Sequence, residues 1–129
     1  MAPILESISP NLIVDNVNAS VDFYTKLLGF KLVASVPETG DFGWAMVQRD
    51  AVTIMFQSLK SMNEDVPSLT FQKGRTATFF IKLKGIDEIY ASVKGKVKIP
   101  MDMRTTFYGM KEFVVEDPDG YYMMFAEDQ

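Results

Sequence analysis

The chain has 129 residues and a formal net charge of −4 at neutral pH, and it contains neither cysteine nor histidine. This length suits one domain, or two very small modules that share a core. The acidic balance makes nucleic acid and anionic membranes poor partners, and the two missing residue types exclude disulfides, thiolate nucleophiles and the commonest metal ligand and general base.

The first half of the chain predicts the order β-α-β-β-β. Asn18 is a suitable N-cap for a helix in which apolar residues recur at helical spacing, and Gly29 is a natural end for that helix. A tight turn at Arg49-Asp50 joins two strands of alternating pattern. The expected elements are strands over 8–14, 30–36, 41–48 and 52–57 and a helix over 18–28.

The second half repeats this order after a polar segment. Residues 59–74 are polar and irregular and include Pro67, which predicts a linker or mobile loop. Asp117-Pro118-Asp119-Gly120 is a strong turn signal, because aspartate bonds turn amides and proline presets φ. The expected elements are strands over 76–83, 97–101, 107–115 and 121–126 and a helix over 86–93.

A single offset of 69 positions aligns the two halves, which indicates an internal repeat. It relates residues of the first strand, the helix start, the turn and the fourth strand to their counterparts in the second half. The pairs are Ser9 with Thr78, Val14 with Leu83, Asn18 with Asp87, Asp50 with Asp119, Met55 with Met124, and Phe56 with Phe125.

Two segments resemble hallmarks of one superfamily. Residues 15–32 carry Phe23-Tyr24 and Leu28-Gly29-Phe30, and they are similar to the FY-x-x-x-LGF pattern in the first helix and second strand of glyoxalase and bleomycin-resistance proteins. Residues 108–121 resemble the last hairpin of those proteins, with its DPDG turn. Both motifs occur in the expected order, so the chain resembles the vicinal-oxygen-chelate superfamily, which also includes extradiol dioxygenases.

The resemblance implies an α+β fold. Tandem βαβββ modules would form curved half-barrel sheets around a cleft, within a single domain over residues 1–129. Module one is expected over about residues 1–58, the loop over 59–74, and module two over about 75–129.

The resemblance also places four metal-ligand positions, on the first and fourth strands of each module. Neutral hydroxyls and thioethers at these positions do not suit a hard divalent ion. A register shift of one or two residues would bring Asn11, Gln57 or Glu127 into play, although Glu127 has the opposite strand parity to Met124 and should face away from the cleft. We therefore expect a metal-free branch with no metal and no cofactor. The four positions fall on Ser9, Met55, Thr78 and Met124.

Without the metal, the cleft would have an apolar, aromatic and polarizable lining with a few hydrogen-bonding groups. The alternative is that these side chains fill the cleft and close it. The predicted ligand-binding residues are Trp44, Met46, Met55, Gln57, Thr78, Phe80, Tyr108, Tyr122 and Met124.

Three functions compete. The first is a cytoplasmic, metal-independent binding protein similar to bleomycin-resistance proteins, a homodimer that holds an apolar or aromatic ligand; its acidic charge also suits a cationic one. The second is a glyoxalase-like lyase or isomerase, or a dioxygenase. The third is a protein-interaction module that uses the segment 59–74.

No catalytic residue is assigned. A metal-free enzyme would need an acid or base, and the candidates form no recognisable constellation in the sequence. They are Tyr108, Tyr122, Glu112 and Arg104.

Overall fold

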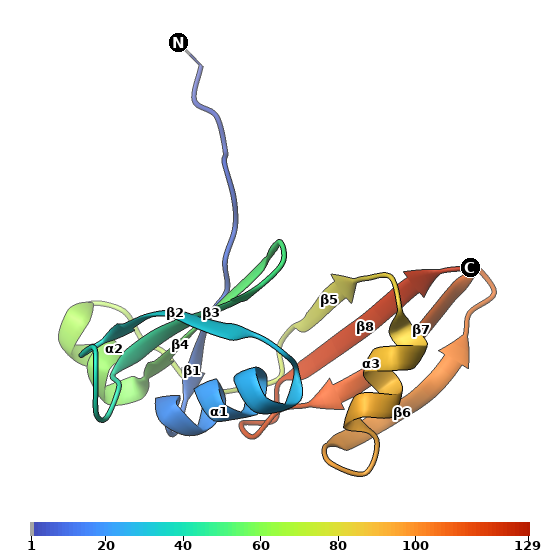
Figure 1. The fold of residues 1–129 in the computed structure, drawn as a ribbon. Coiled ribbons are helices and arrows are strands. Elements are labelled where there is room, and N and C mark those ends of the chain that lie inside the picture. Colours follow the sequence, from blue (N-terminus) through green and yellow to red (C-terminus); the bar gives the residue numbers. More distant parts are fainter. Residues whose placement is uncertain (1) are drawn as a thin grey trace.

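The computed structural model describes residues 2–129, which form two four-stranded sheets one after the other along the chain (Figure 1). Sheet one consists of β1 (Asn11–Val14), β2 (Lys31–Val36), β3 (Trp44–Arg49) and β4 (Val52–Ser58). Sheet two consists of β5 (Thr78–Lys82), β6 (Lys98–Thr105), β7 (Met110–Glu116) and β8 (Tyr122–Asp128). The helices are α1 (Val17–Leu27), α2 (Leu59–Asp65) and α3 (Ile86–Val93). Within residues 2–129, none of the helices is long and apolar enough to cross a membrane.

Both sheets have the same topology. Their strand orders are β1-β4-β3-β2 and β5-β8-β7-β6, and only the first pair in each sheet is parallel. Asn11 lies opposite Met55, and Phe80 lies opposite Met124, so the pairing recurs at the predicted offset (80 − 11 = 124 − 55 = 69). The internal repeat is therefore a repeat of structure.

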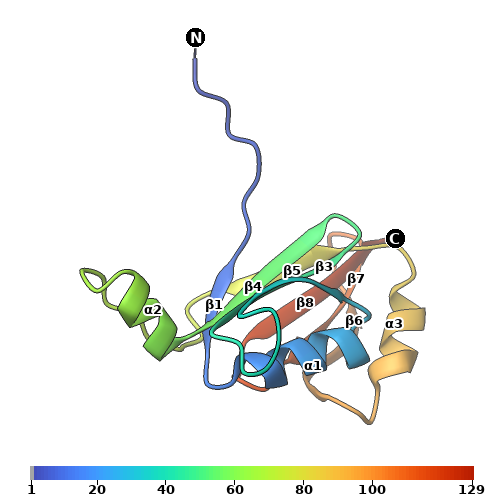
Figure 2. The ribbon, with the colours of Figure 1, turned by 60° about the vertical axis from the view of Figure 1, so that its left-hand side comes forward.

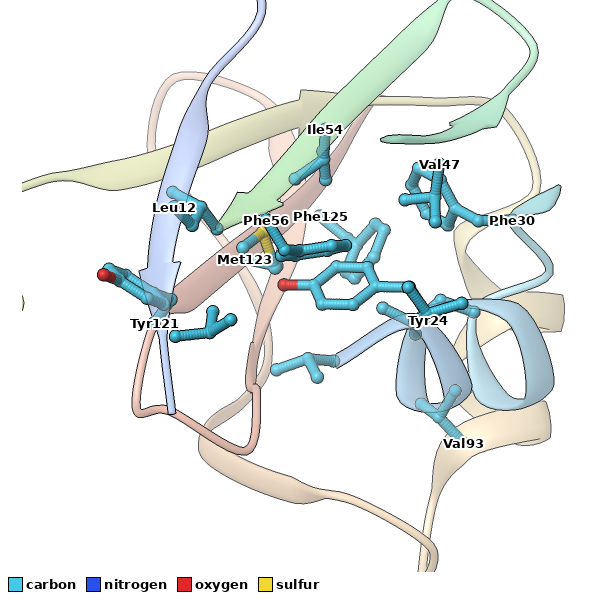
Figure 3. Packing of buried hydrophobic residues seen from close by; sticks show 14 of the residues in the cluster. Leu12, Tyr24, Phe30, Val47, Ile54, Phe56, Val93, Tyr121, Met123 and Phe125 are labelled. Carbon is cyan, nitrogen blue, oxygen red and sulfur yellow. The ribbon is translucent and has the colours of Figure 1, made fainter. Parts of the chain in front are cut away.

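One hydrophobic core joins the helix-covered faces of the two sheets. Helices α1 and α3 lie on the same side of the molecule (Figures 1 and 2). The ring of Tyr24 from α1 is fully buried among Phe56 of sheet one and Met123 and Phe125 of sheet two (Figure 3). Each large side chain buried in this way contributes roughly 1.5–3 kcal/mol of transfer free energy. The two modules therefore depend on one shared core.

The two hallmark motifs meet in this core. The Tyr24 hydroxyl donates to Asp117 Oδ2 at 2.8 Å, and Asp117 Oδ1 accepts the amides of Asp119 and Tyr121, each at 2.9 Å. The Tyr121 hydroxyl donates in turn to the carbonyl of Ile13 at 2.7 Å. Burial, followed by the charge of Asp117, raises the pKa of Tyr24 well above its usual value, and burial also raises the pKa of Asp117. The buried turn thus ties module two to α1 and β1.

The predicted N-cap of the first helix was wrong. The cap is Asn16, whose extended backbone (φ −141°) lets its side chain accept the amide of Ala19 at 2.9 Å. Asn18 lies inside the helix, where its amide group instead bonds the carbonyl of Gly40 and the amide of Phe42. Asn18 therefore fixes the loop before β3.

The predicted irregular segment 59–74 begins with the helix α2. Ser58 caps it by accepting the amide of Ser61 at 3.2 Å, and Met62 is buried on its inner side. The sequence contains a helix start signal here, because Ser58 precedes several good helix formers. The polarity of the stretch predicts a loop, and that prediction is wrong for residues 59–65.

Every strand differs from its predicted bounds, and β1, β3, β6 and β7 differ by three residues or more; β3 begins at Trp44 rather than residue 41. β1 begins at Asn11 rather than residue 8, and Ile8 is exposed. β6 extends to Thr105, and β7 begins only at Met110. A four-residue turn separates these two strands, in which the Thr106 amide donates to the Met110 carbonyl at 2.7 Å.

Candidate ligand-binding site

Each sheet has a second face, which points away from the shared core. Side chains alternate along a strand, so the neighbours of core residues such as Leu12, Phe56 and Phe125 belong to this side. We name these surfaces open face one and open face two. Open face one consists of Asn11, Trp44, Met46, Met55 and Gln57; open face two consists of Thr78, Phe80, Glu112, Val114, Tyr122 and Met124.

Open face one combines an apolar row with an amide network. Met55 lies between Asn11 of β1 and Met46 of β3, and Trp44 lies opposite Gln57. Asn11 Nδ2 donates to Gln57 Oε1 at 2.9 Å, and Gln57 Nε2 donates to Ser61 Oγ at 3.0 Å. Asn11 Oδ1 is buried and has no partner among the described residues. A ligand with an N–H or O–H group would satisfy this acceptor.

Open face two is apolar at its centre and aromatic at one end. Met124 lies between Phe80 and Val114, and 55% of Phe80 is exposed. The guanidinium of Arg75 lies 4.7 Å from the ring centroid of Tyr122 and donates to its hydroxyl at 2.7 Å. This stacking holds the Tyr122 ring in one orientation.

A charged constellation occupies the other end of open face two. Glu112 is only 1% exposed, and its Oε1 accepts Nε and Nη2 of Arg104 at 3.0 and 2.6 Å and the Tyr108 hydroxyl at 3.3 Å. This hydrogen bonding to Glu112 raises the pKa of Arg104. The second carboxylate oxygen, Oε2, is buried without a partner among the described residues.

The structure divides the nine predicted ligand-binding residues between two faces instead of gathering them in one cleft. Trp44, Met46, Met55 and Gln57 lie on open face one, and Thr78, Phe80, Tyr122 and Met124 lie on open face two. The ninth, Tyr108, lies in the turn beside Glu112. A hollow between the two sheets is lined by Ser9, Thr53, Thr78 and Phe80, among others.

Three of the four acid and base candidates lie together in the structure, although the sequence shows no constellation among them. Arg104, Tyr108 and Glu112 meet at a single carboxylate oxygen, while Tyr122 lies apart with Arg75. Asn11 lies on open face one beside Met55, although it is absent from the predicted ligand-binding residues. The available signal was parity, because Asn11 is two residues from Ser9 on the same strand side.

The family's metal positions hold a donor set that does not fit a hard divalent ion. Met55 and Met124 lie opposite Asn11 and Phe80, and Ser9 and Thr78 are two residues earlier in the chain. Thioether, hydroxyl, amide and phenyl groups offer no carboxylate or imidazole ligand. Within residues 2–129, no three His, Cys, Asp or Glu side chains cluster as metal ligands.

Glu127 has the orientation that its parity predicts. Its Oε1 accepts the amides of Gly85 and Ile86 at 3.2 and 2.9 Å, at the start of α3. The carboxylate therefore caps a helix on the core side of sheet two. It does not reach the open face on which Met124 lies.

These paired βαβββ sheets define the glyoxalase-type fold, and the chain belongs to the Glyoxalase/Bleomycin resistance protein/Dioxygenase superfamily, whose sequence profile matches residues 5–125. The predicted superfamily and α+β fold are confirmed. The chain resembles bleomycin resistance proteins in particular. Those of Geobacillus stearothermophilus and Staphylococcus aureus are 30% identical to it over 134 residues, covering 95% of this chain and 96% of theirs.

Solved structures share the fold at lower identity. A protein of unknown function from Agrobacterium tumefaciens superposes with a TM-score of 0.80 at 17% identity, covering 99% of this chain and 98% of its own. TioX from Micromonospora sp. ML1 gives 0.76 at 16% identity, covering 96% and 99%. A glyoxalase/bleomycin resistance protein/dioxygenase from Nocardioides gives 0.76 at 21% identity, covering 98% and 86%.

Proposed function

We propose that this protein binds a small planar aromatic or apolar molecule, including cationic ones, without a metal ion and without transforming it. The observation that carries the proposal is the lining of open face one. Trp44, Met46 and Met55 present aromatic and thioether surface on a sheet face where all three side chains remain partly exposed. Such side chains adapt to flat apolar ligands.

The relatives support this ligand class. Their name, bleomycin resistance protein, states resistance to a drug. The acidic net charge of −4 attracts cationic molecules at long range. Metal independence is part of the proposal, because the residues at the family's ligand positions are Met55, Met124 and neutral side chains.

A homodimer is the second part of the proposal. In one chain the open faces keep partly exposed apolar side chains, and Phe80 is 55% exposed. Sheet faces and edges of this kind favour association. In the proposed dimer, open face one of each chain lies against open face two of its partner, and the ligand lies between the two faces. The single domain with modules over about 1–58 and 75–129 remains part of this proposal.

Trp44 makes the proposal directly testable, because it is the only tryptophan in the chain. We would titrate bleomycin and acridine dyes into the protein in the presence of a chelator and follow Trp44 fluorescence. We expect saturable quenching that is unchanged when zinc, nickel or manganese replaces the chelator. Saturation only with added metal would contradict metal independence, and no quenching by any planar ligand would contradict the binding function.

Two controls complete the test. Met55→Ala removes a thioether next to Met46 and should weaken binding, whereas Lys26→Ala changes an exposed residue of α1 and should not. Sedimentation measured over a range of protein concentrations should give the mass of two chains. A monomer at every concentration would remove the dimer from the proposal.

A further inference from the structure

The buried carboxylate of Glu112 has one oxygen that nothing in the described chain uses. All three donors that reach this side chain, two from Arg104 and one from Tyr108, converge on Oε1. Oε2 is buried and unpartnered. A buried acceptor without a partner destabilises the fold, and native structures contain few of them, so this oxygen requires an explanation.

The ion pair between Arg104 and Glu112 lacks the common bidentate geometry. Arginine and carboxylate usually form a fork in which each oxygen accepts one N–H group. Here Nε and Nη2 of Arg104 both donate to Oε1, at 3.0 and 2.6 Å. The arginine neutralises Glu112 and fixes its position, and it leaves the second oxygen free for another donor.

Glu112 is closed from solvent in the single chain, and the side chains that close it are themselves exposed. Its neighbour across the sheet is Ala126, which has the smallest side chain in that row, and Lys82 beyond Ala126 is held by Asp128 at 2.6 Å. The groups that cover Glu112 from the other side are exposed: the side chain of Arg104 is 51% exposed and Tyr108 is 57% exposed. Tyr108 makes the longest of the three contacts with Oε1, at 3.3 Å, and can move aside at little cost in packing while Arg104 keeps its bonds to that oxygen.

We propose that Glu112 Oε2 anchors a protonated nitrogen of the ligand, so that open face two selects amine or amidine cations. This inference rests on the proposed ligand-binding function and adds the substrate class. A carboxylate oxygen accepts an N–H⁺ donor more strongly than a neutral one. The aromatic part of the ligand would then contact the apolar rows of the open faces, and its basic nitrogen would reach Glu112.

The experiment uses two matched probes and the intact protein. One acridine carries a protonated dimethylaminoethyl chain, and the other carries a 3-methylbutyl chain of the same shape and no charge. Affinities for both are measured by Trp44 fluorescence in the wild type, in Glu112→Gln and in Glu88→Gln. The last variant removes the same charge from the exposed first turn of α3, on the other side of sheet two.

We expect the wild type and Glu88→Gln to prefer the cationic acridine by about tenfold or more, and Glu112→Gln to lose that preference. The neutral acridine should bind all three proteins alike. If Glu112→Gln keeps the preference, the anchor is wrong while the binding function stands. If neither acridine binds the wild type, the proposed function itself fails for planar ligands, and the anchor fails with it.

Arg104→Gln provides a second variant, because it retains a hydrogen-bond donor while removing the competing cation. The carboxylate is then uncompensated, so the preference for the cationic acridine should increase. A structural role alone predicts no change in the ratio of the two affinities. A decrease in that ratio would overturn the anchor, even if Glu112→Gln proved too unstable to measure.

Discussion

Trp44 and Glu112 occupy equivalent places in the two modules but have opposite chemistry. Trp44 lies opposite Gln57, Glu112 lies opposite Ala126, and these two partners are separated by the repeat offset of 69. On open face one the site is neutral, with an indole and an amide network. On open face two it is a buried carboxylate held by Arg104. The same backbone position therefore carries stacking surface in one module and charge in the other.

The helix-covered faces differ far less. Phe56 and Phe125 are related by the same offset, both are buried in the core, and both face a helix-bearing side of their sheet. A shared core restricts both modules to apolar side chains of similar volume, because interiors are close-packed. The core faces keep their apolar character because packing requires it, whereas the open faces keep the pair Met55 and Met124 and differ in chemistry at Trp44 and Glu112.

The largest expected effect tests the similarity of the core faces. Phe56→Ala and Phe125→Ala should each lower the free energy of unfolding by about 3–5 kcal/mol, since each leaves a cavity. Urea denaturation measures both, and Phe80→Ala on open face two should change stability by only about 0.5 kcal/mol. A small effect at one phenylalanine alone would show that the modules are not equivalent in packing.

The buried hydrogen bonds of Tyr24 and Tyr121, which join the two modules, should give the next largest effect. Tyr24→Phe leaves Asp117 Oδ2 without its donor and should cost about 1–3 kcal/mol. The pKa of Tyr24 is raised in the folded state, so folded protein retains the proton above pH 10, where the unfolded chain has lost it. Stability conferred by Tyr24 is therefore fully present below about pH 10 and decreases as the pH rises further.

Denaturant melts at pH 8 to 11 would measure this dependence. The unfolding free energy of Tyr24→Phe should decrease less with rising pH than that of the wild type. Some decrease should remain, because the pKa values of Tyr90 and Tyr121 are also raised in the folded state. Equal slopes in both proteins would mean that Tyr24 does not carry the alkaline sensitivity.

The smallest expected effect sharpens the contrast between the two helices. α1 is capped by the side chain of Asn16, whereas α3 begins at Gly85 and is capped from sheet two by Glu127. Asn16→Ala and Glu127→Ala should each cost about 1 kcal/mol. Hydrogen exchange would then show faster opening of α1 in the first variant and of α3 in the second. Global opening of both helices in either variant would contradict independent capping.

Local patterns were sufficient to predict most of the fold. Apolar residues at helical spacing predicted α3 over Ile86–Val93 with the bounds that the structure has. The missed features depend on competition between neighbours: Asn16 and Asn18 are both good caps, and only the loop contact of Asn18 with Gly40 decides between them. The polar character of residues 59–74 predicts a loop, but the cap at Ser58 and the burial of Met62 make its first part the helix α2.

The candidate site was less predictable. Strand parity placed Trp44 beside Met46 on one face, but it could not reveal how the open faces of the two sheets lie relative to each other. The meeting of Arg104 with Glu112 depends on irregularities in β6 on either side of Met101, which break the alternation of side chains. No pattern in one sequence records the position of such bulges.

The buried hydrogen bonds between the two modules also determine when module one can fold during synthesis. The bonds from Tyr24 to Asp117 and from Tyr121 to Ile13 span 93 and 108 residues, so both join the first module to residues made much later. Module one therefore cannot complete its core until residues 117–121 have been synthesised and have left the ribosome. We expect stalled nascent chains that end before Asp117 to be digested by protease across α1, and released full-length chains to resist; equal resistance would show that module one folds alone.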